Sequence, residues 1–384
     1  MKSTSRLAPL LLGSALALSG CNSGDGAGSG TLNVALTDAP ACGYDHVHVT
    51  IDRVRVHASS TAGDNATGWH EVVLATPRRI DLLTLTNGIL TELGQTGLPA
   101  GRYQQVRLVL LPNDSGDALR NSLVPTGGSE QALATPSAAQ SGYKVVGDFN
   151  VGANEIVDLV LDFDACRSIV PKGNGGYALK PVVTATVQAI SGSIVGYVDP
   201  ADAGATVYAE RNGQLVKGTV ADSSGRFVLA PVLQSGTAGY DVVIARPGDT
   251  TTLVRGVPVV ATATTTLSTS AAPFVLADSP MRTASGTVTP ASAEASVEAL
   301  QAVSGGSYVT GITNATATSG SYGLSLPTAA PLVGDYTGVL PVSLAPDATA
   351  AGRYRLRATT AAGATQSTDV DLRAADATGI DFLF

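Results

Sequence analysis

The stretch VHVTIDRVRV, residues 47–56, predicts a β-strand with one buried face. Its apolar side chains alternate with polar ones, which is the two-residue period of a half-buried strand. The alternation changes phase at Asp52-Arg53, so a regular strand would turn Val54 and Val56 away from the core. A bulge or bend at these two residues would keep both halves facing the core. We therefore predict an irregular core strand here.

The composition of the chain agrees with strands rather than helices. The 384 residues include 43 glycines, and only 14% of the residues are charged and 5% aromatic. Blocks rich in Glu, Lys and Leu are absent. This balance is typical of short strands joined by many turns, so we predict an all-β protein with tandem β-sandwich-like domains. The net charge of −8 comes without a basic stripe, which argues against nucleic acid as a partner.

A short apolar run opens the chain. Lys2 and Arg6 flank its start, and the run itself is too short to span a bilayer permanently. It ends in Leu18-Ser19-Gly20-Cys21, which resembles the lipobox at which bacterial lipoprotein leaders are cut and the next cysteine is lipidated. The resemblance implies that residues 1–20 are a cleaved signal peptide and that Cys21 carries the lipid anchor.

A lipid anchor on Cys21 implies a place in the cell envelope. Lipoproteins of this kind carry several acyl chains, which suffice for stable membrane attachment. Asn22 rather than Asp follows the cysteine, and this favours the outer membrane, with the protein facing either the periplasm or the surface. Residues 21–30 are predicted to be a flexible tether.

Cys42 and Cys166 are the two remaining cysteines. An even pair in an exported protein predicts a disulfide bridge. The loop that this bridge would close is long, and the chain-entropy model gives such a loop roughly 4–5 kcal/mol. The sequence leaves open the alternative of two unrelated buried thiols.

Residues 31–190 form the first predicted domain. Its strands are predicted at residues 31–37, 47–56, 103–111, 155–163 and 179–189. Residues 81–93 fit a strand or a turn pair around Asn87-Gly88. Residues 113–142 are rich in small residues and proline and are predicted to include a long, mobile loop.

Several ordered blocks in this domain resemble the bacterial family named domain of unknown function 4382. The blocks are LTDAP (36–40), VHVTI (47–51) with Val54, DLL (81–83) with Leu85, LPAGRY (98–103) with VRL (106–108), LVLDF (159–163) and LKPV (179–182). The resemblance implies a β-sandwich-like module found on exported bacterial lipoproteins, with no assigned chemistry.

Residues 191–275 and 276–384 are two copies of a smaller unit. The turn DSSGRF at residues 222–227 recurs as SGSY at residues 319–322. Gly225 can supply a positive φ in this turn, and Asp222 can bond its own backbone. The second copy carries an insertion between about residues 328 and 351.

The order of short strands around these turns resembles the carboxypeptidase-regulatory-like, or prealbumin-like, β-sandwich. The likeness is closer in the first copy than in the second. It implies a seven-stranded module that accompanies other domains without catalysing a reaction.

His46 and His48 are the best metal candidates in the sequence. Alternate residues on a strand face the same side, so both imidazoles could hold one Zn²⁺ or Cu²⁺ ion. The candidates for the third ligand are Asp52, His57 and His70. The alternative, favoured by the core-facing Val47 and Val49, is that the two histidines lie on a solvated face.

Asp158, Asp162 and Asp164 are predicted to share one face of a strand. Such a row could bind Ca²⁺ or act as an acid–base pair, with Asp38 joining from another strand. An alternating strand cannot wrap a cation, so the favoured interpretation is the solvent side of an amphipathic strand. Trp69 beside His70 could contact a sugar, although packing against the edge of the sandwich is the simpler interpretation.

The sequence contains no recognisable catalytic constellation. It has no G-x-S-x-G elbow, P-loop or Cys–His pair, and all four histidines fall between residues 46 and 70. We therefore predict a protein that is no enzyme and needs no cofactor. Its expected role is a non-catalytic binding, adhesive or spacer function in the cell envelope, with an envelope protein or polysaccharide as the ligand. Two alternatives remain, a metal-dependent envelope enzyme using His46 and His48 and a purely structural envelope component.

Overall fold

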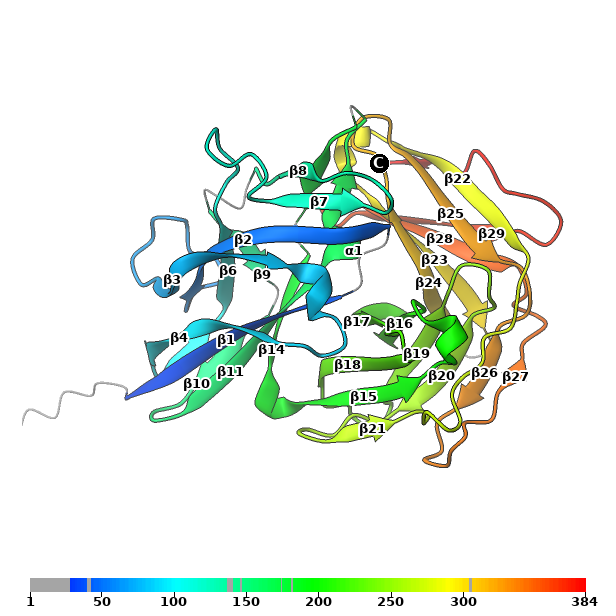
Figure 1. Ribbon diagram of the computed structural model, residues 1–384, viewed down its shortest axis with the longest axis horizontal. Helices are drawn as coiled ribbons and strands as arrows, with labels where there is room; N and C mark the ends of the chain where they lie inside the picture. Colours follow the sequence, from blue (N-terminus) through cyan, green and yellow to red (C-terminus); the bar gives the residue numbers. More distant parts are fainter. Residues whose placement is uncertain are drawn as a thin grey trace, which may run out of the picture.

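The computed structural model describes residues 28–39, 43–136, 141–145, 147–173, 175–180, 182–303 and 306–384. Among these residues almost all regular structure is β-strand, which confirms the predicted all-β fold. The strands form separate sheets that fall into three groups along the chain (Figure 1). In this part of the chain, no helix is long and apolar enough to cross a membrane. The predicted leader and Cys21 lie outside the described residues.

The first group contains two larger sheets whose buried side chains form one core. The four-stranded sheet has the order β14 (Val183–Val187), β11 (Ile156–Asp164), β1 (Ser29–Ala39) and β4 (Thr91–Pro99). The eight-stranded sheet has the order β12 (Ile169–Pro171), β13 (Tyr177–Leu179), β8 (Gln131–Ala134), β7 (Ser122–Pro125), β2 (Tyr44–His57), β6 (Gln105–Leu110) and β9 (Tyr143–Val145), and β3 (His70–Asp81) also pairs with β2. A short pair joins β5 (Gly101–Tyr103) to β10 (Phe149–Val151).

Strand β2 is the core strand predicted from residues 47–56, and it carries the predicted bulge. Its pairing with both β3 and β6 shifts register between Ile51 and Arg53. Val54 and Val56, which follow the shift, are buried. The extra residue restores the phase of the alternation, so both halves of the strand contribute to the same core.

The local expectations for the first unit were met only in part. The turn expected around Asn87-Gly88 is present, with a positive φ at both residues. Residues 82–85 before it form the short 3₁₀ helix η1 (Leu82–Leu85) rather than a strand, because Asp81 accepts the Leu83 N–H and caps the turn. Residues 113–142 also contain the unexpected strands β7 and β8, which extend the eight-stranded sheet, and an irregular segment lies between β6 and β7, where a loop was expected. The tether was expected to reach residue 30, but β1 already begins at Ser29 because it pairs with β4 there.

The second and third groups have the same strand order, so the expected tandem sandwiches are confirmed. The second group consists of β15 (Ser191–Tyr197), β16 (Thr206–Arg211), β17 (Gln214–Val220), β18 (Arg226–Leu233), β19 (Tyr240–Ala245), β20 (Thr252–Val257) and β21 (Thr264–Thr266). The third consists of β22 (Met281–Thr289), β23 (Ser296–Val303), β24 (Gly306–Asn314), β25 (Ser321–Pro327), β28 (Arg353–Thr359), β29 (Thr365–Asp371) and β30 (Phe382–Leu383). In each group the first strand pairs antiparallel with the fourth and parallel with the last.

The insertion in the third unit is structured and belongs to the sheet of the second. Its strand β26 (Leu332–Asp335) pairs parallel with β20, and β27 (Ala345–Pro346) pairs with β26. Figure 1 shows these two strands beside β20. Tyr336, Val342 and Leu344 from the insertion pack against the core of the second sandwich. Chain from one repeat therefore completes the sheet of the other.

A further apolar cluster joins the second and third sandwiches. Tyr208, Val243 and Leu253 on the second meet Leu300 and Val309 on the third. All five side chains are buried. The two repeats are therefore packed face to face rather than strung on a flexible linker.

Candidate functional site

The first candidate site lies where β7, β2 and β3 run side by side. His46 and His48 occupy one face of β2, and Asp81 at the end of β3 is the cross-strand partner of His48. The two imidazole rings are stacked with centroids 5.7 Å apart. Ligand atoms of His46, His48 and Asp81 all lie within 4.8 Å of one another. The structure thus brings together the two predicted histidines and a carboxylate.

Backbone groups hold the Asp81 carboxylate in place. Its Oδ1 accepts the Val47 and Leu83 N–H groups at 3.2 and 3.3 Å. Its Oδ2 lies 2.7 Å from Nδ1 of His46. One oxygen is therefore used by the fold, while the other faces the histidines.

Two further charged side chains border these three residues. Arg79 donates to Oε1 of Glu130 at 2.6 Å and to the Ser122 hydroxyl at 2.9 Å. The same Glu130 oxygen lies 3.9 Å from Nδ1 of His48. The pKa of His46 is raised by its hydrogen bond to Asp81, whereas burial and the nearby Arg79 lower the pKa of His48. The two rings thus have different environments although they are neighbours.

The sequence did not identify the third member of this group. None of the three candidates proposed for it belongs to the group that the structure brings together. His57 packs beside Trp69 at 5.0 Å between ring centroids, and His70 packs beside Tyr103 at 6.1 Å. Asp52 lies at the register shift of β2 and pairs with Arg53. The register of β3 against β2 selects Asp81, and this register is invisible in the sequence.

The second polar group is buried at the junction between the first and second units. Asp38 on β1 and Asp162 on β11 are both buried, so the expectation of a solvated carboxylate face was wrong for Asp162. Lys217 on β17 lies over Asp162, with Nζ 2.6 Å from Oδ1. Asp158, at the other end of β11, is exposed and accepts a hydrogen bond from Asn33. The predicted row of carboxylates is therefore split.

Burial sets the protonation of this carboxylate group. It raises the pKa of Asp38 well above its ordinary value, and the charges of Asp162 and Asp164 add to the effect. Burial also raises the pKa of Asp162 against the opposing effect of Lys217, and it raises the pKa of Asp164 to about 6. Asp164 also caps the short helix α1 (Ala165–Ser168) by accepting the Arg167 N–H. A lysine already occupies the position that a bound cation would take, so this is a structural junction.

The predicted bridge between Cys42 and Cys166 stays a prediction. Cys166 lies in α1, while Cys42 lies outside the described residues. Ala39 pairs with Asp164 in the parallel ladder of β1 and β11. In the sequence, Cys42 follows Ala39 by three positions and Cys166 follows Asp164 by two.

Trp69 packs onto the sheet, as the simpler interpretation expected. The guanidinium groups of Arg55 and Arg107 lie 4.5 and 4.8 Å from its ring centroid. These two arginines are cross-strand partners on β2 and β6. The indole N–H donates to the Gly63 carbonyl at 2.9 Å. The indole ring thus makes cation–π contacts with two arginines, which argues against a role in stacking on a sugar.

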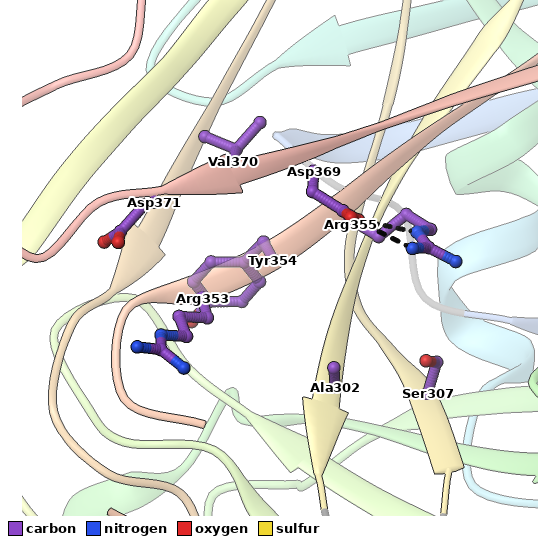
Figure 2. A pocket seen from close by; sticks show the side chains of 8 residues that line it. All are labelled: Ala302, Ser307, Arg353, Tyr354, Arg355, Asp369, Val370 and Asp371. Atoms are coloured by element: carbon purple, nitrogen blue, oxygen red, sulfur yellow. Dashed lines mark hydrogen bonds and ion pairs between the residues drawn. The ribbon is translucent and has the colours of Figure 1, made fainter. Parts of the chain in front are cut away.

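An open hollow, lined by both charged and apolar side chains, lies on the sheet of the third sandwich. It has a volume of about 360 Å³, and it is lined by cross-strand pairs of β28 and β29, including Arg355 and Asp369 (Figure 2). Arg355 and Asp369 form an ion pair of 2.7 Å, drawn as dashed lines in Figure 2. A second hollow of about 460 Å³ shares Ser307 and Arg355 with the first and reaches Asp241 of the second sandwich. The two hollows form one polar surface across the repeats.

Comparison with known protein families gives a match to the first unit. Residues 29–181 match the family described as "Domain of unknown function (DUF4382)". No curated protein matches the chain. The family match fits the sequence blocks that resembled this family, and it assigns no activity.

The similar solved structures are distant. A type II cohesin–X-dockerin complex from Acetivibrio cellulolyticus is 29% identical over 23% of this chain and 58% of that chain, with a TM-score of 0.20. The TIE protein of Bacillus anthracis is 12% identical over 93% of this chain and 50% of that chain, with a TM-score of 0.17. BcpA, the major pilin subunit of Bacillus cereus, is 12% identical over 93% of this chain and 98% of that chain, with a TM-score of 0.14. At such TM-scores, no functional argument rests on these proteins.

Proposed function

We propose that this chain is a lipid-anchored protein of the cell envelope with a non-catalytic binding or spacer role. The observation that carries the proposal is the way in which the three units are locked into one body. A body of three units packed against one another and attached to a membrane at one end is suited to holding a surface at a distance from that membrane.

The first and second units are joined by buried polar contacts. Lys217 reaches across the junction to Asp162, as described above. Asn87, at the turn after η1, accepts the Val228 N–H at 2.9 Å and is bonded to Thr219. Without Lys217, the Asp162 carboxylate would be left buried and unpaired, which costs about 3–5 kcal/mol, so the stability of the first unit depends on the presence of the second.

The first and third units are joined in a similar way. The amide of Asn314 on β24 donates to the carbonyls of Cys166, Arg167 and Ile169 at 3.3, 3.3 and 2.9 Å. Cys166 and Arg167 belong to helix α1 and Ile169 begins strand β12, so one side chain of the third unit contacts the point where the helix ends and the strand begins. Lys180 adds a bond of 2.7 Å to the Glu294 carbonyl. Each unit therefore contacts both others.

The polar surface of the third sandwich is the proposed ligand face. Its arginine and carboxylate groups suit a polar envelope ligand, either a protein or a polysaccharide. The purified chain should bind saturably to envelopes prepared from cells that lack it. Arg355→Glu should weaken this binding at least tenfold. Arg102→Glu is the matched control, since Arg102 forms a similarly exposed ion pair on the first unit.

Two results would count against the proposal. The first is an absence of saturable binding to envelopes, which would leave the purely structural alternative. The second concerns the anchor. Cys21→Ser should leave the precursor without acyl label and release the protein from the membrane fraction, so acyl labelling that persisted in this variant would contradict lipidation.

A metal-dependent envelope enzyme is the second candidate, and the grouping of His46, His48 and Asp81 favours it. Two histidines and a carboxylate are a ligand set found in catalytic zinc sites. The His46 side chain is 54% exposed, however, whereas catalytic metal sites lie in cavities that exclude water. Turnover of a hydrolysable substrate that depends on added metal and disappears in His48→Ala would establish this candidate.

A further inference from the structure

We propose that His46, His48 and Asp81 form a binding site for a divalent transition-metal ion of the Zn²⁺ type. Nothing in the family match assigns such a site. The inference goes beyond the binding role proposed above, since a metal site on the first unit depends neither on the anchor nor on the ligand face of the third sandwich.

The backbone places the three ligands on one face of the sheet. His46 and His48 are two residues apart on β2, so their side chains leave the strand on the same side. Asp81 is the cross-strand partner of His48, and such partners have neighbouring side chains on the same face. The core side of β2 is occupied by Val47 and Val49, which keeps both histidines on the outer side. Three ligands therefore converge without any rearrangement of the backbone.

The state of the His48 ring points to a missing partner. Its Nδ1 is buried and has no hydrogen-bond partner within the described residues, because Oε1 of Glu130, at 3.9 Å, lies beyond hydrogen-bond distance. A buried ring nitrogen without a partner costs free energy, and a metal ion is one of the groups that would satisfy it. His46 and Asp81 are joined by a hydrogen bond of 2.7 Å, and a metal ion would displace the shared proton and bind both groups.

The surroundings orient the carboxylate and leave the site attractive to a cation. Two backbone N–H groups hold Oδ1 of Asp81, which directs Oδ2 toward the histidines. Outer contacts of this kind are typical of metal ligands. Arg79 is the nearby cation, and its charge is matched by Glu130 at 2.6 Å. Arg79 therefore does not pair with Asp81, and the negative charge of Asp81 is available to a metal ion.

The ligand types select the class of ion. Imidazole nitrogen and carboxylate oxygen together suit Zn²⁺ and Cu²⁺, whereas Ca²⁺ and Mg²⁺ prefer oxygen ligands alone. Three protein ligands leave one tetrahedral position open for water or for a donor group of a partner. The site is at the surface, so an ion would enter without any opening of the fold.

The test is a calorimetric titration of the full chain with ZnCl₂, after its free thiols have been alkylated. We expect saturable binding of one Zn²⁺ per chain. His46→Ala, His48→Ala and Asp81→Asn should each weaken the affinity at least tenfold. His57→Ala and His70→Ala are the matched controls, because both residues lie on the same unit but outside the group.

A thermal measurement separates loss of binding from loss of folding. Zn²⁺ should raise the Tm of the parent chain and of both control variants, because it binds the folded state. It should leave the Tm of His48→Ala unchanged, and His48→Ala without metal should melt within a few degrees of the parent. No saturable binding by the parent, or equal affinity in the ligand and control variants, would overturn the proposal.

Discussion

The second and third sandwiches have the same order of strand pairing, but they differ in the side chains of their cores and in the connections between their strands. Both place a tyrosine at the start of the fifth strand, and its hydroxyl bonds a carbonyl at the end of the fourth. Tyr240 donates to the Leu233 carbonyl at 2.8 Å, and Tyr354 donates to the Pro327 carbonyl at 2.6 Å. The repeat thus preserves a specific polar contact as well as the strand order.

The turn glycines are the second shared feature. Gly225 and Gly320 have φ of +79° and +67°. A Cβ on Gly225 would meet the carbonyl oxygen of Val198, directly after β15, at 2.1 Å, and one on Gly320 would meet that of Val288 on β22 at 2.0 Å. In the second sandwich, Asp222 also accepts the Ser224 and Arg226 N–H groups, as predicted. The turn is therefore fixed by a positive φ and by close backbone packing, two requirements that only glycine meets.

The cores and the connections differ between the two sandwiches. The third core has fewer branched aliphatic side chains and more alanine, with buried alanines at positions 284, 295, 299, 315 and 358. Its fourth and fifth strands are joined by the insertion that lends β26 and β27 to the second sheet. A repeat with a core of small side chains can therefore still be stable, because its insertion and its neighbours add contacts that an isolated module lacks.

The largest expected effect is that of reducing the predicted disulfide bridge. It concerns the first unit, because neither sandwich contains a cysteine. Thiol counting on the denatured, unreduced protein should find Cys42 and Cys166 blocked. Reduction should destabilise the first unit by roughly 4–5 kcal/mol, because the bridge would close a long loop. Hydrogen exchange should show this loss in the first unit before the sandwiches. Two freely reacting thiols would rule the bridge out.

Gly225→Ala and Gly320→Ala test the shared turn. Each should destabilise its sandwich by about 2–5 kcal/mol, the sum of backbone strain and overpacking. Gly363→Ala is the control, because Gly363 has a φ of +87° with nothing within 4 Å of a new Cβ, and it should cost about 1 kcal/mol. Denaturant unfolding measures all three, and a cost at Gly320 no larger than at Gly363 would show that the turns are not equivalent.

Glu210→Gln tests the junction between the two sandwiches. Glu210 is fully buried and accepts the Val309 N–H at 3.1 Å, and burial raises its pKa to about 8. The folded protein keeps this proton up to about pH 8, whereas the unfolded chain loses it near pH 4.5. Its contribution to stability is therefore present below about pH 4.5 and is lost as the pH rises to 8.

The Gln variant should remove this pH dependence. At pH 8 it should be roughly 2–4 kcal/mol more stable than the parent, with a difference near zero at pH 5. Thermal unfolding across this range checks the slope. Glu155→Gln, at an exposed glutamate of the first unit, should leave the slope unchanged. If the stability of the parent and of Glu210→Gln changed with pH in the same way between pH 5 and 8, the assignment of this pH dependence to Glu210 would be contradicted.

Leu344→Ala tests the insertion. Leu344 is partly buried against the core of the second sandwich, so its truncation should cost about 1–2 kcal/mol. Amide exchange should accelerate in β20 and not in the corresponding strand β29. Val339→Ala in the same insertion is the control, because Val339 is 69% exposed. Faster exchange in β29 alone would mean that the insertion stabilises its own sandwich instead.

Asp335→Ala should have the smallest effect. Asp335 on β26 pairs with Arg255 on β20 at 2.8 Å, and the aspartate is 67% exposed. Exposed ion pairs contribute about 0–1 kcal/mol, which added salt screens. Asp369→Ala, which breaks the pair with Arg355 on the third sandwich, should cost a similarly small amount. Denaturant unfolding at low and high salt measures both.

Much of the fold was predictable because it rests on near neighbours in the chain. The alternation of residues 47–56 predicted β2 and its bulge, since both follow from the direction of successive side chains. The turn at Gly225 was predictable for the same reason. The 3₁₀ turn at residues 82–85 was missed, because its apolar residues fit more than one period and the cap by Asp81 decided between them.

The candidate site was only half predictable. His46 and His48 stand out by their spacing, but Asp81 joins them through the register of β3 against β2. Alternation indicates which face a residue takes and carries no information on which residue lies opposite it on the next strand. The sequence could therefore identify two members of the candidate site and not the third.

The sequence by itself determined the all-β character, the two repeats and the placement of His46 and His48 on one face of a strand, because each depends on local alternation, spacing and residue type. Only the tertiary structure decided that the second sandwich covers Asp162, that Lys217 pairs with it, and that β26 completes a sheet of another repeat. These contacts join surfaces that are far apart along the chain. Their formation depends on shape and charge over whole domains, which no local pattern of residues encodes.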